Sequence, residues 1–190
     1  ELSRKGDVYI PGDADYVEMA RRESLVTYDR RICWFVPVII VRPGNPKNIR
    51  SLADLARPGM RVGLGDEKAC AIGRLSRPLF ERAGVDFDTV SENVILSTPT
   101  VNELAMKIKL GTIDAAIVWK SVAAQYAKDS ETVAIPEEKN VMPRVAAAVL
   151  TTTQWPAAGR AFVDFLASPR GQKVLRQSGY VVEDPRKKDE

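Results

Sequence analysis

The sequence predicts an α/β protein with mainly parallel sheets, on the basis of three patterns. Short apolar runs rich in Val and Ile alternate with segments whose apolar residues recur at helical spacing, as in successive strand–helix–strand units. Residues 113–119 form an almost continuous apolar run, which is typical of a parallel strand covered on both faces. Gly63 and Gly65 lie at the end of another strand, residues 61–64, and allow the backbone to turn tightly into a helix.

The other elements follow from the same periodicities and from turn residues. Strands are expected at residues 7–10, 28–41, 61–64, 94–96, 113–119, 132–135 and 145–152. Helices are expected at residues 15–22 and 51–56, from the glycine turn to Gly84, from Thr100 to Gly111, at 122–127, from Pro156, and from Ser168 to Gly179. Within the strand at 28–41, Pro37 implies an edge position or a bend.

Apolar stripes predict which faces of three helices are buried. The helix after the glycine turn has a stripe formed by Ile72, Leu75, Leu79 and Phe80. The next helix begins at Thr100, which forms a capping box with Glu103, and its stripe is Val101, Leu104, Ala105 and Ile108. In the helix that Pro156 opens, the residues expected to point inward are Phe162, Phe165 and Leu166.

The predicted elements group into two lobes. Residues 44–140 form a self-contained α/β unit, lobe II. The flanks, residues 1–43 and 141–190, form lobe I from both ends of the chain, so that strands at 34–42 and 145–152 cross between the lobes. A cleft at such a junction is a natural ligand site.

The composition excludes several classes of function. The 190-residue chain has no histidine, so Ser-His-Asp and Cys-His catalysis and histidine metal sites are excluded. The net charge of +3 suits an anionic ligand and is far below that of a nucleic-acid-binding domain. Two cysteines, Cys33 and Cys70, are too few for a disulfide framework. Cys70 near a helix start could be a nucleophile, but we favour a small apolar side chain there.

Two helix starts have the character of an anion site. A helix that begins after a tight turn presents unpaired N–H groups and the positive end of its dipole, and such an end attracts anions. One such start follows the glycine turn at Gly65, and a second turn of the same kind precedes the helix at Thr100. Two such ends directed at one point would supply several neutral donors to one anion.

Four stretches resemble the molybdate- and tungstate-binding proteins of ABC importers, namely residues 6–20, 40–74, 100–123 and 146–180. The most specific pattern in them is "NP…I.SL.DLA.PG.R…GD" together with "FLASP.GQ". The resemblance implies a type 2 periplasmic-binding fold, two-lobed with the ligand cleft between the lobes, in an extracytoplasmic or periplasmic protein that is not an enzyme. It implies a small oxyanion ligand, molybdate or tungstate, no cofactor, no metal beyond the bound oxyanion, and an ABC transporter permease as partner.

The resemblance also implies where the oxyanion is held, by backbone N–H groups and hydroxyls. One contact falls on Ala71 and Ile72 after the GD motif, and another on Thr100 and Val101. Trp119 ends the strand that a tyrosine usually ends in this family, and an indole can donate one hydrogen bond but cannot act as a phenol does. The family's serine-bearing turns near the mature N-terminus are absent from this sequence, which lacks about the first quarter of a typical member. Either that segment precedes residue 1, or this chain lacks half of the site.

Several alternatives stay open. With Trp119 in the tyrosine position, the ligand could be another small anion, such as a small organic anion. The same fold serves as the effector-binding domain of transcriptional regulators, which would require an upstream DNA-binding segment. Glu138 is a weak candidate for a carboxylate ligand in an expanded shell. We expect no nucleic-acid partner, and a membrane association only through the permease or a lipid anchor.

Overall fold

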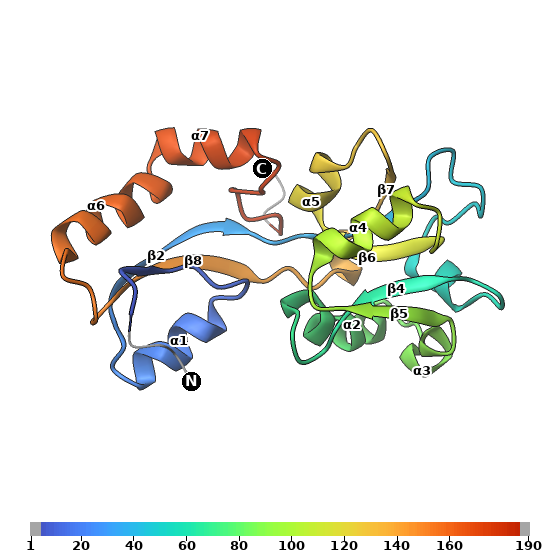
Figure 1. The fold of residues 1–190 in the computed structure, drawn as a ribbon, viewed down its shortest axis with the longest axis horizontal. Coiled ribbons are helices and arrows are strands. Elements are labelled where there is room, and N and C mark those ends of the chain that lie inside the picture. The colour runs from blue at the N-terminus through green and yellow to red at the C-terminus, as the bar shows by residue number, and fades with distance from the viewer. Residues whose placement is uncertain (1–4, 187–190) are drawn as a thin grey trace. The chain divides into compact units, whose positions relative to one another are not determined.

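The computed structural model describes residues 5–186 and divides the chain into two compact units (Figure 1). Unit 2 is Val36–Met142, and unit 1 is formed by the chain on either side of it, up to Phe35 and from Pro143. The sequence placed these boundaries at 43/44 and 140/141. The first boundary of the structure lies earlier in the chain than the predicted one, because β3 (Pro37–Val41) pairs with two strands of unit 2. Local periodicity does not reveal such a long-range pairing.

Unit 2 is built on a five-stranded sheet in the order β5-β4-β6-β3-β7. Its strands besides β3 are β4 (Val62–Gly65), β5 (Val94–Thr98), β6 (Ala115–Trp119) and β7 (Glu131–Ala134). Pairing is parallel between β4 and its two neighbours and antiparallel between β3 and its two neighbours. Parallel pairing in this sheet is thus confined to β5-β4-β6, whereas the sequence predicted mainly parallel sheets.

The helical elements of unit 2 connect these strands, and the two with predicted apolar stripes bury most of them, with Leu75 and Val101 only partly buried. They are the 3₁₀ turns η1 (Leu52–Ala56) and η2 (Glu137–Lys139) and the α-helices α2 (Ala71–Arg82), α3 (Phe87–Ser91), α4 (Val101–Lys109) and α5 (Lys120–Gln125). The sequence did not predict α3, a single short turn of helix capped by the Asp86 carboxylate, which accepts the Asp88 and Thr89 N–H groups.

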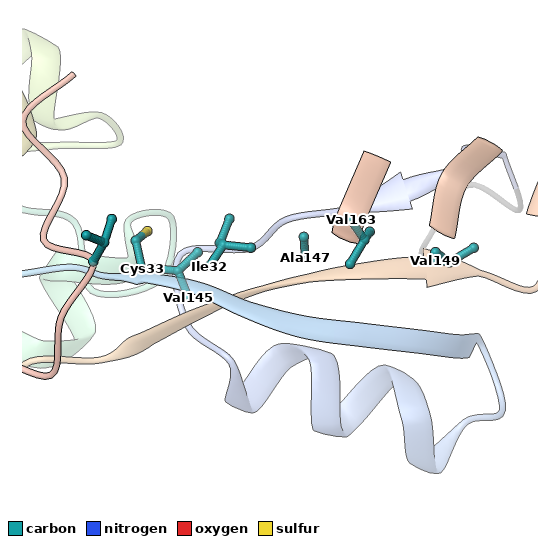
Figure 2. Close-up of a cluster of buried hydrophobic side chains, with 7 residues drawn as sticks. Ile32, Cys33, Val145, Ala147, Val149 and Val163 are labelled. Atoms are coloured by element: carbon teal, nitrogen blue, oxygen red, sulfur yellow. The ribbon is translucent and has the colours of Figure 1, made fainter. Parts of the chain in front are cut away.

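Unit 1 contains an antiparallel three-stranded sheet in the order β1-β8-β2. Its elements are β1 (Val8–Tyr9), α1 (Asp15–Arg22), β2 (Val26–Trp34), β8 (Arg144–Leu150), α6 (Pro156–Ala167) and α7 (Pro169–Gln177). Alternate residues of β8 serve two cores. Val145, Ala147 and Val149 belong to the cluster that also contains Cys33 and Val163, drawn in Figure 2, and Ala146 and Ala148 belong to the cluster with Val17 and Ala20 of α1.

The inward face of α6 differs from the prediction. Phe162 and Phe165 are 47% and 43% exposed, whereas Val163 is fully buried. Gly159, one turn before Val163, lies so close to the sheet that an added Cβ would be 3.2 Å from Val149 Cγ1. The helix is apolar on most of its circumference, so periodicity alone did not identify its close-packing face. Leu166 packs partly buried against this core, as predicted.

Within residues 5–186, no helix has the length and apolar character needed to cross a bilayer.

Candidate functional site

Three neighbouring strands of unit 2 end at the same edge of its sheet. β4 pairs in parallel with β5 on one side and with β6 on the other, so their carboxyl ends lie together. α2 follows β4, α4 follows β5, and Trp119 is the last residue of β6. In open α/β sheets, ligands bind outside the carboxyl ends of the strands. All five residues that the sequence singled out for binding lie at this edge or directly after it: Ala71, Ile72, Thr100, Val101 and Trp119.

The turn between β4 and α2 is held together by Asp66. Its Oδ1 accepts the backbone N–H of Lys68 at 2.9 Å and that of Ala69 at 2.8 Å. Its carbonyl oxygen accepts the N–H of Cys70 at 2.9 Å. These bonds satisfy the amides of Lys68, Ala69 and Cys70, and the amides that come next are those at the start of α2.

Two glycines bring the first turn of α2 against the end of β4. A Cβ added at Gly73 would lie 2.2 Å from the Asp66 carbonyl oxygen, and one added at Gly65 would lie 2.9 Å from the Gly73 nitrogen. The N–H groups of Ala71 and Ile72 are the first two of α2, and the first amides of a helix lack acceptors within it. Ile72 is 1% exposed and its apolar side chain has no donor, so its backbone N–H is the only group that could bind an anion.

The start of α4 is arranged in a similar way. Thr100 caps the helix as predicted, its Oγ1 accepting the Glu103 backbone N–H at 3.4 Å. Val101 therefore occupies the first helical position, where its N–H group has no acceptor within the helix. Thr98, at the end of β5, donates its hydroxyl to the Thr100 carbonyl oxygen at 2.9 Å. The two starts together present backbone N–H groups and one threonine hydroxyl.

Trp119 lies at the same edge with its side chain mostly buried. It pairs with Pro37 of β3, its exposed fraction is 6%, and it is the N-cap residue of α5. The next backbone N–H, that of Lys120, is held by the Val36 carbonyl oxygen at 2.8 Å. Trp119 is therefore fixed in place by the strand on one side and by the helix start on the other.

The family described as "Bacterial extracellular solute-binding protein" matches residues 1–181. The chain belongs to this family. Among its relatives, the molybdate-binding protein ModA of Mycobacterium tuberculosis is 31% identical over 175 residues, which are 92% of this chain and 65% of that protein. The solute-binding chain described here thus spans about two thirds of the length of that relative.

Solved structures show the same fold. The periplasmic molybdate-binding protein of Azotobacter vinelandii has a TM-score of 0.76 at 14% identity, covering 94% of this chain and 79% of that one. The sulfate-binding protein SubI of Mycobacterium tuberculosis has a TM-score of 0.73 at 21% identity, covering 96% of this chain and 71% of that one. These likenesses confirm the predicted fold class, and the family match confirms that the chain belongs to the extracellular solute-binding proteins.

The opposite edge of the unit 2 sheet of this solute-binding protein holds a buried charge. The side chain of Asp114 is 1% exposed, and it accepts the Arg61 backbone N–H at 3.1 Å, Arg61 Nη2 at 2.8 Å and Arg42 Nη2 at 3.0 Å. Burial alone would raise the pKa of Asp114, but the hydrogen bonds and charge of Arg61 lower it below the ordinary carboxyl value. These arginines are therefore committed to a carboxylate of the protein itself.

The other predicted functional groups are placed as follows. Cys33 and Cys70 are both free and buried, and burial raises the pKa of Cys33 to about 12. Glu138 is exposed in η2, where its backbone carbonyl oxygen accepts Arg82 Nε at 3.1 Å. The described residues contain no group of three Cys, Asp or Glu side chains that could hold a metal ion.

The sequence reasoning did not single out Asp66 or Thr98. The signal for Asp66 is present, because an aspartate in a glycine-rich turn commonly accepts the N–H groups two or three residues on. Thr98 carries no such local signal. Its contacts join turns that lie about thirty residues apart in the chain and become visible only in the folded protein.

Proposed function

We propose that this solute-binding protein captures a tetrahedral oxyanion, molybdate or tungstate first, and delivers it to the permease of an ABC importer. The observation that carries the proposal is that two helices, α2 and α4, start from the carboxyl ends of two adjacent parallel strands. The relative named for molybdate binding supports the choice of ligand. The protein is proposed to act outside the cytoplasm, without a cofactor and without catalysis.

The chemistry of the site favours a small anion. An anion removed from water needs several hydrogen-bond donors, because a buried unpaired charge costs several kcal/mol. Each helix start contributes about 0.3–2 kcal/mol of charge–dipole stabilisation, and the N–H groups of Ala71, Ile72 and Val101 add direct donors. Because these donors are neutral, the site binds an anion without cationic side chains, which carboxylates of the protein could otherwise pair with.

We assign the remaining roles as proposals. Thr100 donates its hydroxyl to the oxyanion, while its oxygen continues to accept the Glu103 N–H. Trp119 borders the bound anion and offers its indole N–H at most. The cleft between the two lobes, the permease as partner and attachment to a membrane through a lipid anchor stay predictions.

Isothermal titration of the intact protein with molybdate, tungstate, sulfate and phosphate tests the ligand. We expect heat with molybdate and tungstate and much weaker binding of phosphate, which carries a proton at neutral pH and so requires an acceptor. Absence of heat with all four anions would overturn the ligand class.

A second candidate is a protein for another small anion. Two observations favour it: Trp119 stands where the family resemblance expects tyrosine, and a sulfate-binding protein shares the fold. Tighter binding of sulfate than of molybdate in the same titration would select this alternative. The regulator hypothesis is not carried forward, because the family that matches is one of extracellular solute-binding proteins.

A further inference from the structure

We infer that Thr98 is a positioning residue that fixes the spacing between the two anion-binding turns, and with it the choice among oxyanions. The inference rests on the proposed function, since it assigns a task within the same site. Thr98 is the last residue of β5, is 4% exposed, and lies between the two turns without belonging to either helix.

Thr98 makes one hydrogen bond to each turn. Its backbone carbonyl oxygen accepts the Asp66 N–H, the first amide after β4, at 2.7 Å. Its hydroxyl donates to the carbonyl oxygen of Thr100, the cap of α4, at 2.9 Å. One residue therefore links the turn that begins α2 to the turn that begins α4.

This link lies at the point where the sheet stops holding the two turns together. The ladder between β4 and β5 ends at the pair Gly65 and Thr98. Asp66 in turn accepts the N–H groups of Lys68 and Ala69, so its position sets where α2 starts. A displacement of Thr98 would therefore move both helix starts, because short hydrogen-bonded segments connect this residue to them.

The spacing of fixed donors decides which anion they fit. Donors that are held in place by other hydrogen bonds bind more tightly than donors that must be ordered on binding. Molybdate and sulfate carry the same charge and the same tetrahedral shape, and they differ in size. If the hydroxyl tie to Thr100 is lost, α4 can move relative to α2, and discrimination by size is expected to fall.

The test compares Thr98→Val, which keeps the shape and removes the hydroxyl, with Thr98→Ser, which keeps the hydroxyl. Thr112→Val is the matched control, since Thr112 also donates its hydroxyl to a backbone carbonyl oxygen, that of Lys107 at 3.1 Å, in the connection from α4 to β6. Titration with molybdate and sulfate gives affinities and their ratio. Hydrogen exchange of the Asp66 and Glu103 amides reports on the two turns without any ligand.

We expect Thr98→Val to weaken molybdate binding about five- to tenfold, the effect of one neutral hydrogen bond, to lower the molybdate-to-sulfate ratio and to speed exchange at Asp66 and Glu103. Thr98→Ser and Thr112→Val should keep the wild-type ratio and exchange at these amides. A purely structural role would lower the thermal midpoint without changing the ratio.

The inference is overturned if Thr98→Val leaves the exchange of both amides unchanged, or if it binds both anions as the wild type does. If the wild-type protein binds none of the anions, the proposed function fails. Faster exchange in Thr98→Val alone would then still establish that Thr98 holds the two turns in place.

Discussion

The two edges of the unit 2 sheet differ in whether their polar groups have partners within the protein. At the edge where β4 and β6 begin, a buried carboxylate, that of Asp114, is neutralised by Arg61 and Arg42. At the edge where these strands end, Asp66 satisfies the turn amides and leaves the first amides of α2 without acceptors in the helix. The first edge pairs its own buried charge, and the second has helix-start amides that we propose bind the anion.

This difference separates stability from function within one small sheet. The arginine–aspartate cluster ties β3, β4 and β6 together and contributes to the free energy of unfolding. The carboxyl edge contributes donors whose positions are set by close backbone packing and by short hydrogen bonds. Substitutions at the first edge should therefore change stability alone, and substitutions at the second should change anion affinity as well.

The largest effect is expected from Gly73→Ala. The added Cβ would lie 2.2 Å from the Asp66 carbonyl oxygen and 2.5 Å from the Gly65 carbonyl oxygen, and neither backbone group can move without shifting the turn. We expect a loss of about 3 kcal/mol in the free energy of unfolding, the upper end for an overpacked site, measured by urea denaturation.

Gly171→Ala is the matched control, because its Cβ would lie 2.1 Å from the Phe165 carbonyl oxygen in unit 1. Both variants should lose stability, but only Gly73→Ala should lose molybdate affinity at a temperature where both remain folded. Equal affinities in the two folded variants would contradict the assignment of the α2 start to the anion site.

The next largest effect is expected from Asp114→Asn. Removing one partner of a fully buried ion pair costs about 3–5 kcal/mol, and we expect about 2 kcal/mol here because Arg42 and Arg61 are 31% and 41% exposed and can turn to water. Asp129→Asn, which removes the exposed pair with Lys109, should cost less than about 1 kcal/mol. Molybdate affinity should be unchanged in both.

The same substitution should change the pH dependence of stability. The pKa of Asp114 is lower in the folded protein than its ordinary value of 3.8, so the unfolded chain binds this proton more readily. The contribution of Asp114 is therefore fully present above that value and is lost as the pH falls below it. The thermal midpoint of the wild type should fall more steeply below pH 4 than that of Asp114→Asn, and parallel curves would be evidence against the cluster.

The sequence predicted those parts of the structure that depend on local periodicity. The stripes of α2 and α4 were recognised because each lies on one regular helix face. The apolar run of β6 was recognised because that strand is buried at every position, as a strand covered on both faces is. The inward face of α6 was predicted wrongly, because the spacing of Phe162 and Phe165 predicts that they are buried, whereas both are exposed. The small residue Gly159, rather than hydrophobicity, determines which face approaches the sheet.

The site shows the same limit. The helix starts and the family resemblance predicted four binding residues, which stay predictions: Ala71, Ile72, Thr100 and Val101. The topology brings these two helix starts to one edge. Thr98 was not found, because its hydrogen bonds join two turns that are distant in sequence. Residues that act through local capping are predictable, whereas residues that relate two separate turns require the register between β4 and β5.

The smallest effect, and the most selective, is expected from Thr100→Ala. The substitution removes an N-cap, which costs about 1 kcal/mol in the free energy of unfolding, and it removes a hydroxyl proposed to contact the anion. Ser168→Ala is the matched control, since Ser168 Oγ accepts the Gly171 N–H at 3.3 Å and caps α7 in unit 1. Similar losses of stability are expected, measured by urea denaturation, with molybdate binding weakened about fivefold only in Thr100→Ala. If the two variants bind molybdate equally well, Thr100 serves α4 as a cap and the anion is held by backbone amides alone.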